Sequence, residues 1–195
     1  MVTLEAYFGG LVGIFAVIGL VRGFLKELGL TTVLLVWLFA IDLVLPRMEE
    51  LIETPGSFLQ RLGLTPDTDD LVMWLFFSAL TFGVVFIAYH GETLAFGGTA
   101  PRGLLGGVFA LLIGVVNGYL ASGTLWWIMD RFNYPVSGLV IRFSGESVLS
   151  PLADNIVNVS RLLPPDLLAG GMDEPGTLGI LPVLLITLVL LRVLR

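Results

Sequence analysis

Two polar side chains lie inside long apolar segments of the sequence, and they are the first candidates for chemistry. Asp42 and Asn117 are each flanked by apolar residues on both sides. A polar group at membrane depth is costly, so it needs an interior partner or access to water and counts as a functional hypothesis. The two residues could line a proton or solute path. The structural alternative is that Asp42 reaches the outer interface, four residues before Pro46, and that Asn117 bridges two helices.

A second candidate pair, His90 and Glu92, follows the third apolar segment and could act as a proton relay or a metal pair. A metal site usually takes three or four ligands, so solvation of both side chains at the membrane interface is favoured. The glycine-rich loop 97–103 is similar to an anion-binding turn, but it lacks the P-loop lysine and is interpreted as a flexible membrane-entry loop. No catalytic triad or carboxylate pair can be assembled. We therefore expect no enzymatic activity, no cofactor and no metal.

Composition excludes several further classes of protein. The chain has no cysteine, which rules out disulfides, thiolate metal sites and a thiol nucleophile. Its net charge is −6 and Lys26 is its single lysine, which argues against a nucleic-acid partner because phosphate binding uses clusters of Lys and Arg.

The elements that must position these residues are membrane helices. Hydrophobic residues make up 56% of the 195 positions and charged residues 13%, against roughly 45–50% and about 25% in a soluble domain. The apolar residues form blocks near the roughly 20 residues that cross a bilayer. The expected spans are about 4–21, 28–45, 71–89, 104–128 and 178–194. The sequence predicts an all-α, polytopic membrane helix bundle of about five transmembrane helices, whose first apolar segment is retained.

Prolines and amphipathic patterns predict the shorter elements. Pro46 should end the second span, and Pro66 should begin the third. Residues 48–52 and 58–62 are candidate interfacial helices, and 150–163 has the apolar spacing of a helix on the membrane surface that a Pro-Pro pair at 164 should end. The chain is expected to divide into a four-helix membrane core at 1–130, an extracytoplasmic segment at 131–177 and a C-terminal transmembrane helix at 178–195.

Positive charges predict the orientation of the bundle, because short loops rich in Lys and Arg stay in the cytoplasm. Five alternating spans place Arg22, Lys26 and Arg102 on the same side as the C-terminal arginines. The acidic second loop then lies on the opposite side. The predicted topology has the N-terminus outside and the C-terminus in the cytoplasm.

Small residues recur every four positions along the fourth span, and this spacing places them on one helix face. They are Gly106, Ala110, Gly114, Gly118 and Ser122. The face could be a self-association or gating surface. The favoured alternative is packing against another helix of the same chain, with Gly9 and Gly13, or Gly19 and Gly23, as the partner face.

The charged run Arg22-Gly23-Phe24-Leu25-Lys26-Glu27 lies between the first two expected spans. It resembles the signature between the first two helices of the colicin V production protein family of small bacterial inner-membrane proteins. Arg102, entering the glycine-rich fourth span at Gly106, is similar to a second family motif, although Pro101 and Ile113 replace its usual aspartate and arginine. The resemblance covers 4–130. It implies a bacterial inner-membrane protein linked to toxin export or envelope homeostasis, without enzymatic activity.

The sequence is therefore compatible with three functions. The first is a non-enzymatic membrane protein of this type, whose partners are the lipid bilayer and other membrane proteins or a second copy. The second is an accessory subunit of a larger membrane complex, such as an energy-converting one. The third is a small channel or transporter that uses Asp42 and Asn117.

Overall fold

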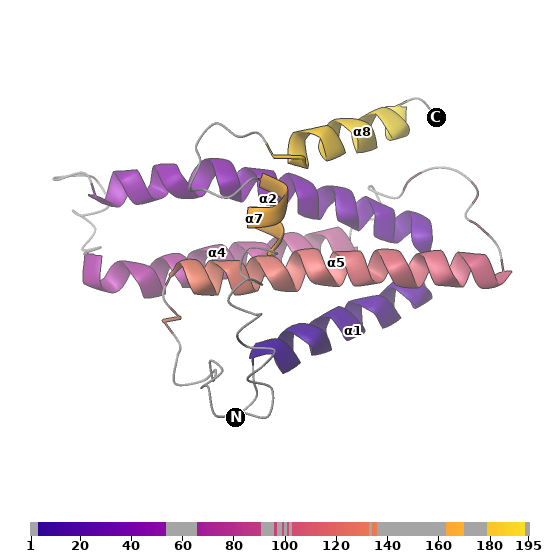
Figure 1. Ribbon diagram of the computed structural model, residues 1–195, viewed down its shortest axis with the longest axis horizontal. Helices are drawn as coiled ribbons and strands as arrows, with labels where there is room; N and C mark the ends of the chain where they lie inside the picture. The colour runs from indigo at the N-terminus through magenta and orange to yellow at the C-terminus, as the bar shows by residue number, and fades with distance from the viewer. Residues whose placement is uncertain are drawn as a thin grey trace.

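The computed structural model describes residues 4–53, 66–90, 96, 99, 101, 103–132, 134–135, 163–169 and 179–193, which form helices and no strand (Figure 1). The helices are α1 (Leu4–Arg22), α2 (Phe24–Glu53), α4 (Pro66–His90), α5 (Gly103–Arg131), α7 (Pro164–Ala169) and α8 (Leu181–Val193). The predicted all-α class is confirmed for this part of the chain, and α4 begins at Pro66 as expected.

In the described part of the chain, three helices are long and apolar enough to cross a membrane, within Phe24–Glu50, Asp70–His90 and Gly103–Arg131. Two shorter apolar helices, Ala6–Arg22 and Leu181–Leu190, accompany them. The chain therefore has the helices of a membrane protein, while the expected count of about five spans is not confirmed. The 13 residues of α8 rise only about 20 Å at 1.5 Å each, short of a hydrocarbon core of about 30 Å.

The prediction that Pro46 ends the second span is wrong. Helix α2 continues through Pro46 to Glu53, so the expected separate helix at 48–52 is its last part. A proline removes one backbone donor, but transmembrane helices tolerate this when packing holds the flanking turns. Here Ile41 and Leu45, just before Pro46, are almost fully buried against Phe77.

The Pro-Pro pair at 164, which the sequence predicts as a helix end, begins a helix in the structure. Pro164 is the first residue of α7. The first turn of a helix leaves its N–H groups unpaired in any case, so proline is well suited there. The expected surface helix at 150–163 lies outside the described residues apart from Leu163, and the expected interfacial helix at 58–62 lies wholly outside them.

Helix α5 is the centre of the bundle, with α1, α2, α4 and α7 packed against it (Figure 1). One apolar cluster joins Phe15 of α1, Leu34 of α2 and Leu120 of α5, and it includes Leu181 at the start of α8. A second cluster lies further along α2 and α5. The outward faces are also apolar, as at Phe86 and Ile87, which suits a surface covered by lipid.

Candidate polar centre at the first helical hairpin

Helices α1 and α2 are joined by a single residue, Gly23, so the charged run 22–27, which lies between the expected spans 4–21 and 28–45, is almost entirely helical. Gly23 has φ +88°, a conformation that glycine adopts without steric cost. Its N–H donates to the carbonyl of Gly19 at 2.9 Å, and its own carbonyl accepts from the N–H of Glu27 at 3.2 Å. This tight turn places Arg22 in the last turn of α1 and Glu27 in the first turn of α2. Each charge is opposite in sign to the nearby end of the helix dipole, which is the favourable arrangement.

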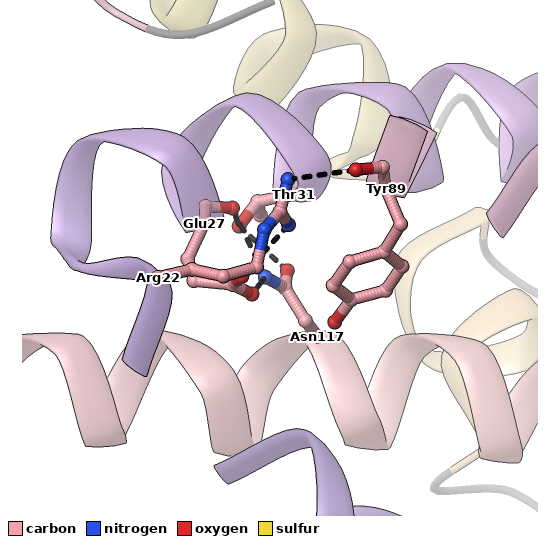
Figure 2. A network of polar contacts seen from close by, with 5 residues as sticks. All are labelled: Arg22, Glu27, Thr31, Tyr89 and Asn117. Atoms are coloured by element: carbon pink, nitrogen blue, oxygen red, sulfur yellow. Dashed lines mark hydrogen bonds and ion pairs between the residues drawn. The ribbon is translucent and has the colours of Figure 1, made fainter. Parts of the chain in front are cut away.

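The centre of the site is the Glu27 carboxylate, whose side chain is 0% exposed. The Nη1 atom of Arg22 donates to Glu27 Oε1 at 2.9 Å, and the Arg22 side chain is 20% exposed. The same guanidinium donates from Nη2 to the main-chain carbonyl of Tyr89 at 3.4 Å and lies 4.3 Å above the Tyr89 ring. Arg22 therefore links the ends of α1 and α4 to the start of α2 (Figure 2).

Asn117 holds the other carboxylate oxygen from the middle of α5. Its Nδ2 atom donates to Glu27 Oε2 at 2.8 Å and to the Glu27 main-chain carbonyl at 3.0 Å. Its Oδ1 atom accepts a hydrogen bond from the Thr31 hydroxyl at 2.7 Å. Asn117 is itself 0% exposed, so the amide has exchanged water for protein partners. Figure 2 shows these side chains converging between α2 and α5.

This arrangement compensates a charge that would otherwise be very costly to bury. An ionised carboxylate is retained in a protein interior when it is paired and its remaining lone pairs accept hydrogen bonds. Both Glu27 oxygens have such partners. Breaking a buried pair by removing one partner typically costs about 3–5 kcal/mol. The hairpin and α5 are therefore joined by polar contacts in addition to apolar packing.

One polar atom beside the centre is unsatisfied. The Tyr89 hydroxyl is buried and has no hydrogen-bond partner among the described residues. Figure 2 shows the Tyr89 ring beside Arg22, with the hydroxyl directed toward α5. Because buried hydroxyls are nearly always paired, this hydroxyl is an exception among the polar groups of the centre.

The small-residue face of α5 packs within the chain. A Cβ on Gly114 would lie 2.6 Å from the Phe15 carbonyl oxygen, and one on Gly118 would lie 2.7 Å from the Val12 Cα. The partner glycine on α1 is Gly19, whose Cβ would lie 2.5 Å from the Ala110 carbonyl oxygen. Ser122 is buried on the same face, and Gly106 is half-buried near its start. By contrast, a Cβ on Gly9 or Gly13 would meet nothing within 4 Å.

The structure brings only one of the two intramembrane candidates into the centre. Asp42 is half-buried on α2, 15 positions beyond Glu27, which corresponds to about 22 Å along a helix. It therefore does not join Asn117 in a common path. His90 is exposed and contacts Phe86 of its own helix. Glu92 and Arg102 lie outside the described residues, as does most of the loop 97–103.

Among the motif residues of the hairpin, the structure separates buried from exposed positions. Lys26 is exposed, and Phe24 is half-buried with its ring 5.9 Å from that of Phe109. Glu27 was predictable as a motif residue but not as a buried one, because Arg22 and Lys26 beside it suggest a solvated loop. Thr31 and Tyr89 were not singled out from the sequence. The available signal was the spacing of Glu27 and Thr31, since residues four apart share one helix face.

No group of three or more His, Cys, Asp or Glu side chains that could hold a metal ion occurs among the described residues. The groups of the centre, a carboxyl, a guanidinium, an amide and a hydroxyl, offer hydrogen bonding and proton exchange. Comparisons with protein-family models, with curated proteins and with solved structures find no match for this chain.

Proposed function

We propose that this chain is a non-enzymatic, multi-pass bacterial inner-membrane protein of the colicin V production type that contributes to toxin export or envelope homeostasis. One observation supports the proposal above the others. The residues that carry the resemblance at the first hairpin, Arg22, Gly23 and Glu27, are the ones that form the tight turn and the buried ion pair. A motif that builds an interhelical contact fits a protein that acts through its membrane structure.

The alternative of a channel through Asp42 and Asn117 has less support. Asn117 uses its amide to hold Glu27 and Thr31, and Asp42 lies about four turns away along α2. The self-association surface proposed on α5 is occupied by α1 at Gly114 and Gly118. An accessory subunit of a larger complex would therefore have to dock through another face.

The test is secretion of colicin V from a bacterial strain whose own colicin V production protein has been deleted. We expect the wild-type chain to restore secretion and Glu27→Gln to restore much less, because the ion pair that joins the end of α1 to the start of α2 is lost. Asp42→Asn is the matched control, since it makes the same chemical change elsewhere on α2, and it should behave like wild type. Membrane levels of each variant are measured in parallel.

Failure of the wild-type chain to restore secretion, or to protect the strain against detergent and chelator stress, would refute this role. Two measurements then distinguish the remaining alternatives: migration of the protein in mild detergent and ion flux in liposomes. Stable co-migration with other identified subunits favours an accessory subunit, and flux in liposomes that is lost in Asp42→Asn favours a channel.

A further inference from the structure

The polar centre differs from the other ion pair that the structure describes. At the far end of α2 and α5, Arg131 donates from both Nε and Nη2 to the two carboxylate oxygens of Glu49, at 3.1 and 2.8 Å. Both side chains of that pair are partly exposed. At the hairpin, Arg22 binds a single oxygen of a carboxylate that is fully buried. The fully buried pair therefore has one hydrogen bond between its charged groups, and the partly exposed pair has two.

The partners of Arg22 remain in place if Glu27 loses its charge. One guanidinium nitrogen already donates to the Tyr89 carbonyl, and the cation lies over the Tyr89 ring. With 20% of its side chain exposed, Arg22 also retains contact with the surface. The cation is therefore supported without the carboxylate, by the ring and by a main-chain acceptor.

The neutral form of Glu27 is accommodated as well. Asn117 donates to Oε2, and a carbonyl oxygen of a protonated carboxyl accepts that hydrogen bond as a carboxylate does. Protonation of Oε1 creates an O–H donor that needs an acceptor. The buried Tyr89 hydroxyl, for which the structure describes no hydrogen bond, lies on the ring beneath the same Arg22 guanidinium and is the candidate acceptor.

We propose that Glu27 is an intramembrane proton-binding site, with Arg22 as its counter-ion in the ionised state and Asn117 as the donor that holds it in both states. Hydronium at the hairpin end transfers a proton to a lone pair of Oε1, so that one O–H bond of hydronium breaks, the carboxyl O–H bond forms and water is left. The hydrogen bond from Arg22 Nη1 is released, and no other covalent bond changes. Among the described residues, the charged or titratable groups in contact with Glu27 or its counter-ion are Arg22 from α1 and Tyr89 from α4, while α5 contributes the neutral amide of Asn117.

This proposal rests on the geometry of the centre and does not require the role in secretion. The network includes Asn117 and Thr31, and the hydrogen bond that α2 makes to α4 further along, from Trp37 to Thr81, is separate from it. Among the described residues the hydrogen-bonded network therefore ends at Thr31, and Arg22, with 20% of its side chain exposed, is its contact with the surface. Proton binding would change the contact between α1 and α2 without transport across the membrane.

The experiment is infrared spectroscopy of the purified full-length protein in phospholipid vesicles as the pH is lowered. A protonated carboxyl removed from water absorbs at higher frequency than one in water. We expect such a band to appear on acidification in wild type and in Asp42→Asn, and to be absent in Glu27→Gln. In Arg22→Gln the band should be present already at neutral pH, because the counter-ion is missing. Tyr89→Phe should shift its frequency.

Labelling the wild-type protein with carbon-13 at the glutamate carboxyl gives an independent readout that needs no substitution. The band should then shift, whereas a band from aspartate would not. A wild-type spectrum without the band at any pH at which the protein stays folded would overturn the proposal. The proposal would also be overturned by a band that persists at high pH, that is present in Glu27→Gln, or that does not shift when the glutamate carboxyl is labelled.

Discussion

The side-chain amide of Asn117 donates to both the main-chain carbonyl and the carboxylate of Glu27, at 3.0 and 2.8 Å. A single residue in the middle of α5 thus holds the first turn of α2 at two points. Thr31, one turn further along α2, donates to the same amide. Apolar packing alone permits small slips of one helix along another. These directional contacts fix the register of the hairpin on α5.

Asn117→Leu should destabilise the protein because it leaves the buried Glu27 carboxylate without its second partner. An unsatisfied buried polar group costs about 1–3 kcal/mol, and more when it is charged. Thermal unfolding in detergent, followed by loss of the monodisperse chromatographic peak, should show a lower midpoint. Val116→Leu, a lipid-facing change on the neighbouring residue, should leave the midpoint unchanged. Equal midpoints for the two variants would contradict the bonding described for Asn117.

Gly114→Ala should loosen the contact between α1 and α5. The added Cβ would lie 2.6 Å from the Phe15 carbonyl oxygen and 3.0 Å from the Ala16 Cα, and backbone atoms cannot move aside as side chains do. Overpacking of this kind costs about 1–3 kcal/mol. The free energy of unfolding in mixed micelles provides the measurement. Gly13→Ala on α1 is the control, because its Cβ meets nothing within 4 Å.

Gly23→Ala should strain the hairpin turn. An L-residue at φ +88° costs about 1–2 kcal/mol, and the turn has no second residue to absorb the change. The loss should appear as a lower unfolding midpoint and as weaker protection of the Glu27 amide against hydrogen exchange. Gly83→Ala, in a helical position with open space around it, should instead be neutral or stabilising. A stable Gly23→Ala variant would mean that the turn can adopt another conformation.

The sequence was most informative where the physical constraint was local. Apolar runs of bilayer length predicted α2, α4 and α5, because a helix satisfies all the backbone groups of such a run within the segment itself. Asn117 was identifiable because a primary amide in such a run is conspicuous. Glu27 was harder to interpret, since its burial depends on Asn117, 90 positions away, and on a one-residue turn that allows α2 to begin at Phe24.

The prolines show the limit of local rules in this chain. Pro46 has the chemistry of a helix terminator, yet the packing of Ile41 and Leu45 against Phe77 keeps α2 continuous. Pro164 has the same chemistry and starts a helix, because the first turn needs no donor from it. Which outcome applies depends on tertiary contacts that no single segment of sequence contains.

The predicted sidedness can be tested because the natural chain has no cysteine. Lys26→Cys and Glu50→Cys place single thiols at exposed positions toward opposite ends of α2. Given the positive-inside rule, we expect an impermeant maleimide to label Glu50→Cys in spheroplasts and Lys26→Cys only after lysis. Labelling of Lys26→Cys alone in intact spheroplasts would invert the topology.

Trp127→Phe should release α7 from the bundle. The indole Nε1 of Trp127 donates to Asp166 Oδ1 at 2.9 Å, and this contact joins a six-residue helix to α5. A hydrogen bond to a charged group contributes about 1.5–3 kcal/mol, so local opening of α7 should become roughly tenfold more frequent or greater. Hydrogen exchange measured by mass spectrometry should report this in peptides covering 163–169, without change in α1.

Gly123→Ala provides a second route to the same outcome without altering a polar group. Its Cβ would lie 2.5 Å from the Pro164 Cδ, so the start of α7 would have to move away from α5. Gly107→Ala on the same helix is the control, because its Cβ would only touch Leu20 at 4.0 Å. If both Trp127→Phe and Gly123→Ala leave exchange in 163–169 unchanged, α7 does not depend on this contact. Faster exchange in both, with Gly107→Ala like wild type, shows that Trp127 and Gly123 together form the docking site for α7.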